Sequence, residues 1–194
     1  MSKLNISNKP SPFSVKVKVK RVLWAVCYAL LFKTSPNPAR KWRARLLRMF
    51  GAKVSLKARV SPNVEITMPW NLEMEDYATI GSYAIIYNTA KIKIGYQATV
   101  SQYSYLCSAT HDYEDAHFTL YAKPITIKRN AWVAADVYVG PGVTIGEGTV
   151  VGARSSVYKD LPPHKVCVGN PARVIKDRVI NKDLSNEKNP LSDM

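Results

Sequence analysis

The chain has 194 residues and a formal net charge of +14, with 46% hydrophobic and 22% charged residues. This length suits a single domain, and the composition excludes low-complexity and fibrous classes. The cysteines, Cys27, Cys107 and Cys167, lie far apart and form no CxxC pair. We therefore expect no disulfide framework and a reducing, cytoplasmic compartment.

The positive charge is concentrated near the N-terminus. Residues 1–64 contain fifteen Lys or Arg and no acid, and the first acid is Glu65. A charge so unevenly placed favours an anionic partner. A membrane surface is the first interpretation, a solvated arm that only aids solubility is the second, and nucleic acid is the third.

Residues 1–14 are polar with two prolines and are predicted to be disordered. Residues 15–53 form a basic segment with helical patterns. Its apolar run, Val22 to Phe32, has too little polar interruption for a surface helix, so we expect a helix buried on most sides or lying in an interface. The run is shorter than the roughly 20 residues that span a bilayer, and no small-residue cleavage site of a secretory signal follows it.

A second helix is predicted to begin with Asn37 as N-cap and Pro38 as first helical residue, and to end at Gly51. Its apolar face is predicted from the helical spacing of four side chains: Trp42, Leu46, Met49 and Phe50. The basic residues occupy the other positions: Arg40, Lys41, Arg43, Arg45 and Arg48.

From Val54 onward, aliphatic residues recur every six positions, with two slips of two residues and one longer gap. They are Val54, Val60, Ile66, Leu72, Ile80, Ile86, Ile94, Val100, Leu106, Ile127, Val133, Val139, Ile145, Val151 and Val157. A small or polar residue usually follows each of them. This period fits neither an amphipathic helix nor an alternating strand.

A period of six predicts an all-β solenoid with three flat faces per turn, in which stacked coils bury one continuous core. The aliphatic residue points inward and the small residue allows the corner. We expect about five coils over residues 54–175. The N-terminal helices would cover the open sheet edge of the first coil, and residues 176–194 would form a polar, mostly loop-like tail.

The longest interruption of the repeat is a loop at about residues 107–124. An irregular segment of this length in a solenoid is more often functional than accidental. It contains His111 and His117, two of the three histidines of the chain. Histidine is the side chain whose ordinary pKa suits a general base near neutral pH, so both are candidates for proton transfer.

Several longer segments resemble one family of enzymes. The C-terminal stretch IGEGTVVGARSSVYKDLPPHKVCVGNPARVIKDR and the preceding PITIKRNAWVAADVYVGPGVTIG are similar to the signature of hexapeptide-repeat acetyltransferases. PWNLEMEDYATIG, YNTAKIKIG and SQYSYLCSATHDYEDAHFTLYAKPI extend the resemblance upstream. Over roughly residues 20–178 the chain most resembles the colanic acid biosynthesis acetyltransferases, relatives of the galactoside, maltose and nodulation-factor O-acetyltransferases.

This resemblance implies a left-handed parallel β-helix and a homotrimer with each active site between two prisms. It implies direct transfer of an acetyl group from acetyl-CoA to a sugar hydroxyl in exopolysaccharide or capsule biosynthesis, with no metal. The saccharide acceptor could be lipid-linked, and the N-terminal segment could contact an anionic membrane. No nucleic acid is expected as a partner.

The resemblance also assigns the coenzyme contacts. Trp132 would line the pantetheine channel, and the backbone N–H of Ala135 would face the thioester oxygen, where a backbone donor stabilises an oxyanion. Ala153 would let the coenzyme lie close to the coil. Lys159 and Arg173 would contact its phosphates, which need charge-assisted donors.

For the acceptor side, the resemblance makes His111 the general base and places Asn88 and Asp112 at the acceptor. Asp112 follows His111 in sequence, which leaves open whether it orients the ring. His117 is interpreted as loop surface and His164 as a turn residue.

Three rival functions remain at this point. A zinc carbonic anhydrase on the same fold would need all three histidines to converge on one metal. A non-catalytic scaffold would use the repeats for assembly only. An acyltransferase with a different donor, such as a longer acyl chain on a carrier protein, is the third.

Overall fold

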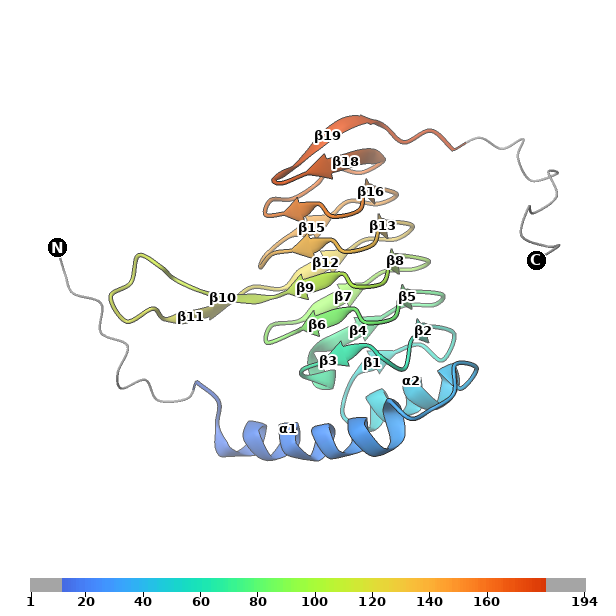
Figure 1. Ribbon diagram of the computed structural model, residues 1–194, viewed down its shortest axis with the longest axis vertical. Coiled ribbons are helices and arrows are strands. Elements are labelled where there is room, and N and C mark those ends of the chain that lie inside the picture. The colour runs from blue at the N-terminus through green and yellow to red at the C-terminus, as the bar shows by residue number, and fades with distance from the viewer. Residues whose placement is uncertain (1–11, 181–194) are drawn as a thin grey trace.

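The computed structural model describes residues 12–180, which form a β-solenoid with helices across its N-terminal end (Figure 1). Three parallel sheets make the faces of the prism. Face A contains β1 (Lys53–Val54), β4 (Leu72–Met74), β7 (Ile92–Ile94), β12 (Ile125–Ile127) and β15 (Thr144–Ile145). Face C contains β3 (Glu65–Ile66), β6 (Ile85–Tyr87), β9 (Tyr105–Cys107), β14 (Tyr138–Val139) and β17 (Ser156–Val157).

Face B is the longest sheet of the prism. It contains β2 (Arg59–Val60), β5 (Thr79–Ile80), β8 (Thr99–Val100), β13 (Trp132–Val133), β16 (Val150–Val151), β18 (Lys165–Gly169) and β19 (Ala172–Asp177). The chain visits faces A, B and C in turn, so each coil lies on the previous one in parallel register. The predicted left-handed β-helix with an N-terminal helical segment is confirmed.

The period of six defines the core. All of the predicted inward positions, from Val54 to Val157, are 5% exposed or less. They stack in register along each face, as Val60 does beneath Ile80 and Ile80 beneath Val100. This column of aliphatic side chains is one continuous hydrophobic core that no single coil could form.

The slips in the repeat have one structural cause. Both slips and the long gap fall at the corner between faces C and A, and the strand that follows is three residues long each time. A three-residue strand points two side chains inward, so Leu72, Ile92 and Ile125 form an extra inward layer. The prediction of Leu72 as a hexad position is therefore wrong by two residues: Met74 lies in register with Val54 and Ile94, so the first slip falls between Ile66 and Met74. The short 3₁₀ helix η2 (Pro69–Asn71) makes the first of these corners.

The solenoid continues one coil further than expected. Leu161 bridges Ile145 on face A, and the buried Cys167 lies against Val151 on face B. The chain then reverses into β19, which pairs antiparallel with β18. The predicted boundary at residue 175 therefore falls inside a strand, and the tail begins after Asp177. Residues 1–11 and 181–194, where disorder and a loop-like tail were predicted, lie outside the described residues.

The small residue after each inward aliphatic has a steric reason. A Cβ on Gly81 would lie 2.7 Å from the backbone nitrogen of Gln102 in the next coil, closer than real Cβ contacts allow. The turn itself is made two residues later by a residue in the left-handed region, for example Tyr83 (φ 61°) and Tyr103 (φ 61°). The corner therefore needs a small residue such as Gly81, where the next coil comes close, and a left-handed backbone conformation two residues later, as at Tyr83.

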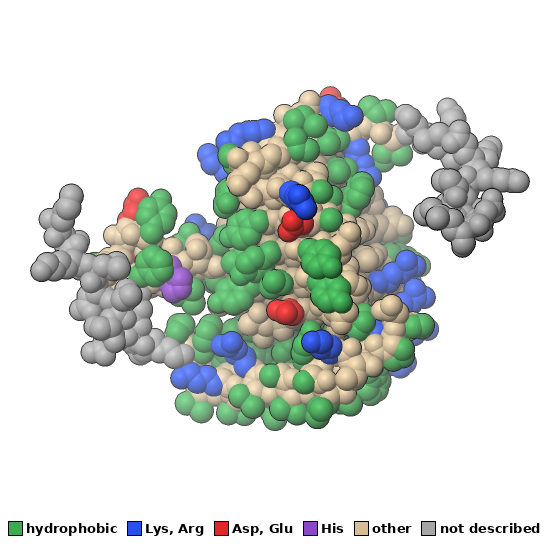
Figure 2. Space-filling model, viewed as in Figure 1, with side chains coloured by type: hydrophobic (Ala, Val, Ile, Leu, Met, Phe, Trp, Pro, Cys, Tyr) green, Lys and Arg blue, Asp and Glu red, His purple; other side chains and the backbone are tan. Residues whose placement is uncertain are grey.

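Helix α1 (Val15–Cys27) begins at the N-cap Ser14 and continues as a π-helical turn, η1 (Tyr28–Phe32). Of this apolar run only Trp24 and Phe32 are buried, and the Trp24 indole N–H donates to the carbonyl of Ile66 at 2.6 Å. The expectation of burial on most sides is wrong. The hydrophobic side chains on the other side of α1 line the lower edge of the molecule (Figure 2).

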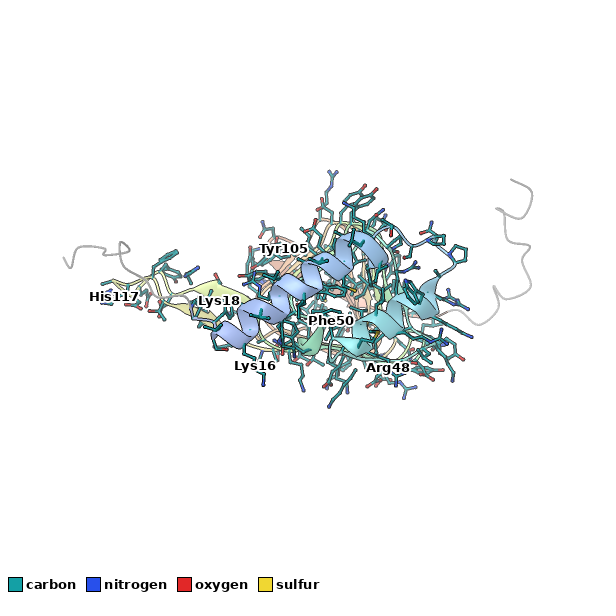
Figure 3. All side chains as sticks on the ribbon, turned by 90° about the horizontal axis from the view of Figure 1, so that it is seen from below. Lys16, Lys18, Arg48, Phe50, Tyr105 and His117 are labelled. Atoms are coloured by element: carbon teal, nitrogen blue, oxygen red, sulfur yellow. The ribbon has the colours of Figure 1, made fainter. Side chains whose placement is uncertain are left out.

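Helix α2 (Arg40–Met49) also lies across the N-terminal end, beside α1 (Figure 3). It begins later than predicted, because its N-cap is Ala39 and Asn37 makes no side-chain cap. The predicted apolar face is also wrong in part: Trp42 is 43% and Met49 77% exposed. The buried side chains of α2 are Arg43, Ala44, Leu46 and Leu47.

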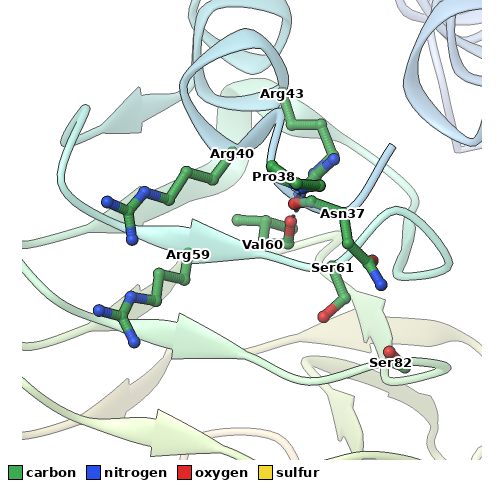
Figure 4. A pocket seen from close by; sticks show the side chains of 8 residues that line it. All are labelled: Asn37, Pro38, Arg40, Arg43, Arg59, Val60, Ser61 and Ser82. Atoms are coloured by element: carbon green, nitrogen blue, oxygen red, sulfur yellow. Dashed lines mark hydrogen bonds between the residues drawn. The ribbon is translucent and has the colours of Figure 1, made fainter. Parts of the chain in front are cut away.

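The burial of Arg43 follows from the carbonyl groups around it. Its Nε donates to the carbonyl of Val60 at 2.6 Å (Figure 4). Its terminal nitrogens donate to the carbonyls of Pro36 and Asn37 and to the Ser35 hydroxyl. Burial lowers the pKa of this guanidinium. Together with Trp24, Arg43 satisfies carbonyls of the first coil, so the prediction that the helices cover its open edge is confirmed.

Candidate active site

The predicted loop at 107–124 is a β-hairpin arm that projects from the corner between faces C and A (Figure 1). Its strands, β10 (Ala109–His111) and β11 (Leu120–Ala122), pair antiparallel, with His111 opposite Leu120. The chain rejoins the solenoid at β12 in register with β7. The arm therefore carries His111 out of the core on paired backbone rather than on an irregular loop.

The imidazole of His111 is exposed and held in one orientation. Its Nδ1 lies 2.7 Å from the carbonyl oxygen of Phe118, and its ring stacks on the Phe118 ring at 4.7 Å between centroids and 9° between planes. Because a carbonyl can only accept, Nδ1 carries the proton in this contact. Nε2 then has the free lone pair that a general base needs.

The acids of the arm hold its turn. Asp112 accepts a hydrogen bond from the backbone N–H of Glu114 at 3.0 Å, and Asp115 accepts from the N–H groups of His117 and Thr119. Hydrogen bonds from Thr119 and His117 hold the pKa of Asp115 below its usual range. The ring of His111 is thus oriented by the Phe118 carbonyl and not by Asp112. No signal in the sequence pointed to this carbonyl.

A hollow of about 610 Å³ lies beside the histidine, lined by the arm itself. Its walls include His111, Asp112, Tyr121 and Lys123. This hollow carries both an imidazole and a carboxylate, and it is the concave surface of the described chain that contains the predicted catalytic residue.

Asn88 lies apart from this hollow, inside the same corner one coil below. Its side chain is fully buried: the amide oxygen accepts from the N–H of Met68 at 2.8 Å, and the amide nitrogen donates to the Met68 carbonyl at 2.6 Å. Asn71 donates to the backbone carbonyls of Asn88 and Thr89. Both polar groups of the Asn88 side chain are used to hold the corner together, so the predicted acceptor contact has no geometric support.

Two predicted coenzyme residues come together at the corner between faces B and C. Ala135 and Ala153 lie in successive coils and line a hollow of about 330 Å³ with Tyr103, Asp136 and Arg154. The N–H groups of Ala134 and Asp136 bond to neighbouring coils, at Val151 and Gln102. Within residues 12–180 the Ala135 N–H has no acceptor, so a backbone donor faces this part of the surface.

Trp132 lies on face B, next to this corner, between Thr99 and Val150. The indole is 46% exposed, and its N–H donates to the hydroxyl of Ser101 at 3.0 Å. Ser101 therefore fixes the ring plane against the sheet. The repeat pattern showed Ser101 only as a small residue after Val100, and it gave no sign of this contact.

The two predicted phosphate contacts do not lie together. Lys159 is exposed at the corner between faces C and A, just after β17. Arg173 is exposed on β19, at the end of face B, where its Nη1 donates to the carbonyl of Ala172. In one chain these cations belong to different edges of the prism.

The same separation applies to the predicted base and the predicted coenzyme residues. His111 extends from the corner between faces C and A, whereas Ala135 and Ala153 line the corner between faces B and C. His164 lies at the third corner, where its N–H donates to Glu147. The three histidines do not converge, and no group of three His, Cys, Asp or Glu within residues 12–180 could hold a metal ion.

Stacked hexads with a histidine arm at one corner define a transferase of the hexapeptide-repeat class. The family model "Bacterial transferase hexapeptide (six repeats)" matches residues 124–159. The putative colanic acid biosynthesis acetyltransferase WcaF of Escherichia coli K12 is 48% identical over 179 residues, covering 92% of this chain and 98% of the relative.

Solved structures agree with this similarity. A maltose O-acetyltransferase from Clostridium difficile 630 superposes with a TM-score of 0.77 and 28% identity over 86% of this chain and 90% of that one. A galactoside acetyltransferase in complex with coenzyme A gives a TM-score of 0.70 and 28% identity over 86% and 84% of the two chains. The chain belongs to the hexapeptide-repeat acetyltransferase family, and it is an acetyltransferase.

Proposed function

We propose that this acetyltransferase moves an acetyl group from acetyl-CoA directly to a saccharide hydroxyl in exopolysaccharide or capsule biosynthesis, with His111 as general base. The observation that carries the proposal is the oriented imidazole, whose Nδ1 bonds to the Phe118 carbonyl and leaves Nε2 free. The named activities of the relatives, on colanic acid, maltose and galactosides, support a saccharide acceptor.

Each step of the transfer can be given to a group of this chain. His111 Nε2 takes the proton of the acceptor hydroxyl while the hydroxyl oxygen forms a bond to the thioester carbonyl carbon. The Ala135 N–H donates to the oxyanion that develops on the carbonyl oxygen. When the carbon–sulfur bond breaks, the proton on His111 Nε2 passes to the leaving thiolate, so the enzyme returns to its starting state.

The contacts to the two substrates are divided between the two corners. Trp132, Ala135 and Ala153 are proposed to line the coenzyme channel on face B and its corner with face C. Asp112, which lines the hollow beside His111, is proposed to contact the acceptor.

The positions of these residues support a homotrimer. Because His111 and the coenzyme residues lie at different corners of the prism, a complete site needs the corner of a neighbouring copy. The same holds for Lys159 and Arg173, which can reach one coenzyme only if it lies between two prisms. Closed threefold packing of parallel prisms supplies three such sites.

Mixed oligomers test this arrangement. His111→Ala removes the base, and Ala153→Trp fills the exposed coenzyme hollow; each variant alone should be inactive. Denatured and reassembled together in equal amounts, they should regain about one quarter of the wild-type sites, because one site in four then combines an intact His111 with an intact Ala153. Absence of any recovered activity, with trimers confirmed by light scattering, would place the whole site in one chain.

The reaction is tested by thiol release from acetyl-CoA with a saccharide acceptor, followed by mass spectrometry of the product. A different acyl donor is the alternative that the geometry leaves open. Transfer from an acyl carrier protein without thiol release from acetyl-CoA would favour that alternative, and a folded trimer that is inactive with either donor would favour a scaffold.

We further propose that the protein is cytoplasmic and meets its acceptor as a lipid-linked saccharide at the inner face of the membrane. No helix within residues 12–180 has the length and apolar character to cross a bilayer. Contact with the membrane would therefore be peripheral, through the N-terminal helices.

A further inference from the structure

The outer surface of α1 is an uninterrupted apolar stripe. On α1 it consists of Val15, Val19, Val22, Leu23 and Val26, and it continues at Leu30 of η1; all six are 52–74% exposed. At 3.6 residues per turn the five side chains of α1 fall within a sector about 100° wide. The buried Trp24 lies on the opposite side, against the first coil. The helix therefore covers the solenoid with one face and leaves a second apolar face pointing away from it.

Cations flank this stripe. Lys16 and Lys18 are two positions apart, which places them about 200° apart around the helix and so on opposite sides of the stripe. Lys20 and Arg21 follow on the side nearer the solenoid, and residues 1–64 contain no acid. Figure 2 shows the hydrophobic side chains along the lower edge of the molecule with Lys and Arg above them.

We propose that the outer stripe of α1 docks on an anionic lipid bilayer, with the helix lying in the plane of the interface; this inference rests on the proposed use of a lipid-linked acceptor. An apolar face bordered by Lys and Arg is the pattern of helices that lie in the boundary between headgroups and acyl chains. A second copy of this face is a poorer occupant, because a twofold pairing would bring the same unopposed cations together.

The position of the stripe suits a multivalent contact. Helix α1 lies across the N-terminal end of the prism (Figures 1 and 3). In a trimer of parallel prisms, all three α1 helices lie at the same end and form one flat surface. Three weak contacts on one rigid body bind far more tightly than one.

Docking through the α1 helices also places the arm close to the bilayer surface. The arm leaves the third coil, and coils are spaced by about 4.8 Å, so it starts roughly 10 Å above the first coil. Both views show the N-terminal end of α1 on the side from which the arm projects, with Lys16 and Lys18 labelled at that end and His117 at the tip of the arm (Figures 1 and 3). The arm that carries His111 therefore lies nearer the helical end of the prism than the end formed by β18 and β19.

Vesicle flotation of the full-length trimer tests the proposal. Wild-type protein should float with vesicles of phosphatidylcholine and phosphatidylglycerol, and more weakly with phosphatidylcholine alone. Val22→Glu with Val26→Glu should abolish flotation on both, because the stripe then carries charge. Lys16→Gln with Lys18→Gln should weaken binding to anionic vesicles by about fivefold per residue and leave the neutral vesicles unchanged.

Matched controls lie elsewhere on the chain. Ile175→Glu changes an exposed apolar residue at the opposite end of the prism, and Lys128→Gln removes an exposed cation of the fourth coil; both should float like wild type. Each stripe variant should keep the trimer mass and the rate of thiol release with a soluble saccharide, because its side chains face away from the core.

Three results would overturn the docking surface. The first is wild-type protein that stays at the bottom of the gradient with anionic vesicles, and the second is a Val22→Glu and Val26→Glu double variant that floats like wild type. The third is a stripe variant that changes the oligomer mass. The last would assign the stripe to a second copy. A protein that floats as described but releases no thiol would refute the proposed reaction and leave the docking surface standing.

Discussion

Replacement of His111 by alanine is the most direct test of the active site. Loss of a positioned general base costs about 10²- to 10⁴-fold in turnover, equivalent to a barrier higher by about 3–5 kcal/mol. His111→Ala should show a decrease in that range, because no other side chain presents an oriented imidazole in the hollow of the arm. Coenzyme affinity should be unchanged, since none of the proposed contacts to CoA comes from the arm.

Steady-state thiol release and calorimetric titration of CoA measure the two properties separately. The melting temperature should stay close to wild type, because His111 is exposed on an arm outside the aliphatic core. His117→Ala is the matched control at the tip of the same arm, and its rate should be near wild type. A His111→Ala protein that folds, binds CoA and turns over at the wild-type rate would remove this residue from the mechanism, and His117 would be the next to examine.

Three further substitutions, one of them with a matched control, separate coenzyme binding from stability. Trp132→Ala should weaken CoA binding about tenfold in titration with little change in melting temperature, because the half-exposed indole covers the proposed channel. Gly81→Ala should destabilise the solenoid by about 1–3 kcal/mol in urea denaturation, since its Cβ would meet the backbone of Gln102. The control Gly140→Ala should cost less than about 1 kcal/mol, because its Cβ would lie 3.4 Å from the nearest atom, the carbonyl oxygen of Val157. Arg43→Met should cost about 2–4 kcal/mol in the same assay by leaving buried carbonyls without a donor. Wild-type CoA affinity in Trp132→Ala would refute the coenzyme contact of Trp132. Wild-type stability in Gly81→Ala or Arg43→Met would refute the packing role given to that residue.

The solenoid could be predicted from the sequence because its core depends on one repeated spacing. Each aliphatic position from Val54 to Val157 is buried, and the slips of two residues mark the three-residue strands that begin at Leu72 and Ile92. The end of the solenoid was missed because Leu161 and Cys167 do not continue the spacing, although both are inward.

The helices were predicted less well because their environment, rather than their pattern, decides which face is buried. Arg43 is buried because edge carbonyls of the first coil surround it, and Met49 is exposed although it continues the apolar spacing. For the same reason, hydropathy alone suggested a buried helix over Val22 to Phe32 and could not show that its apolar residues divide between two opposite faces.

The residues of the site could be named from resemblance, but their hydrogen bonds could not. The contacts that orient His111 and Trp132 come from Phe118 and Ser101, which carry no sequence signal for these roles. For Asn88 the motif likewise gave no sign that its buried amide bonds to the backbone of Met68 at the corner, and its contact with the acceptor stays a prediction.

The corner between faces C and A has an evolutionary consequence. The chain leaves the prism after β9 and rejoins it at β12, which pairs with β7 below and β15 above as though no arm intervened. The length and sequence of the arm are therefore independent of the stacking that stabilises the fold. A change confined to residues 109–122 can alter the hollow beside His111 while the corner that holds Ala135 and Ala153 stays intact. Under the proposed function, one scaffold can thus diversify its acceptors by exchanging a single hairpin.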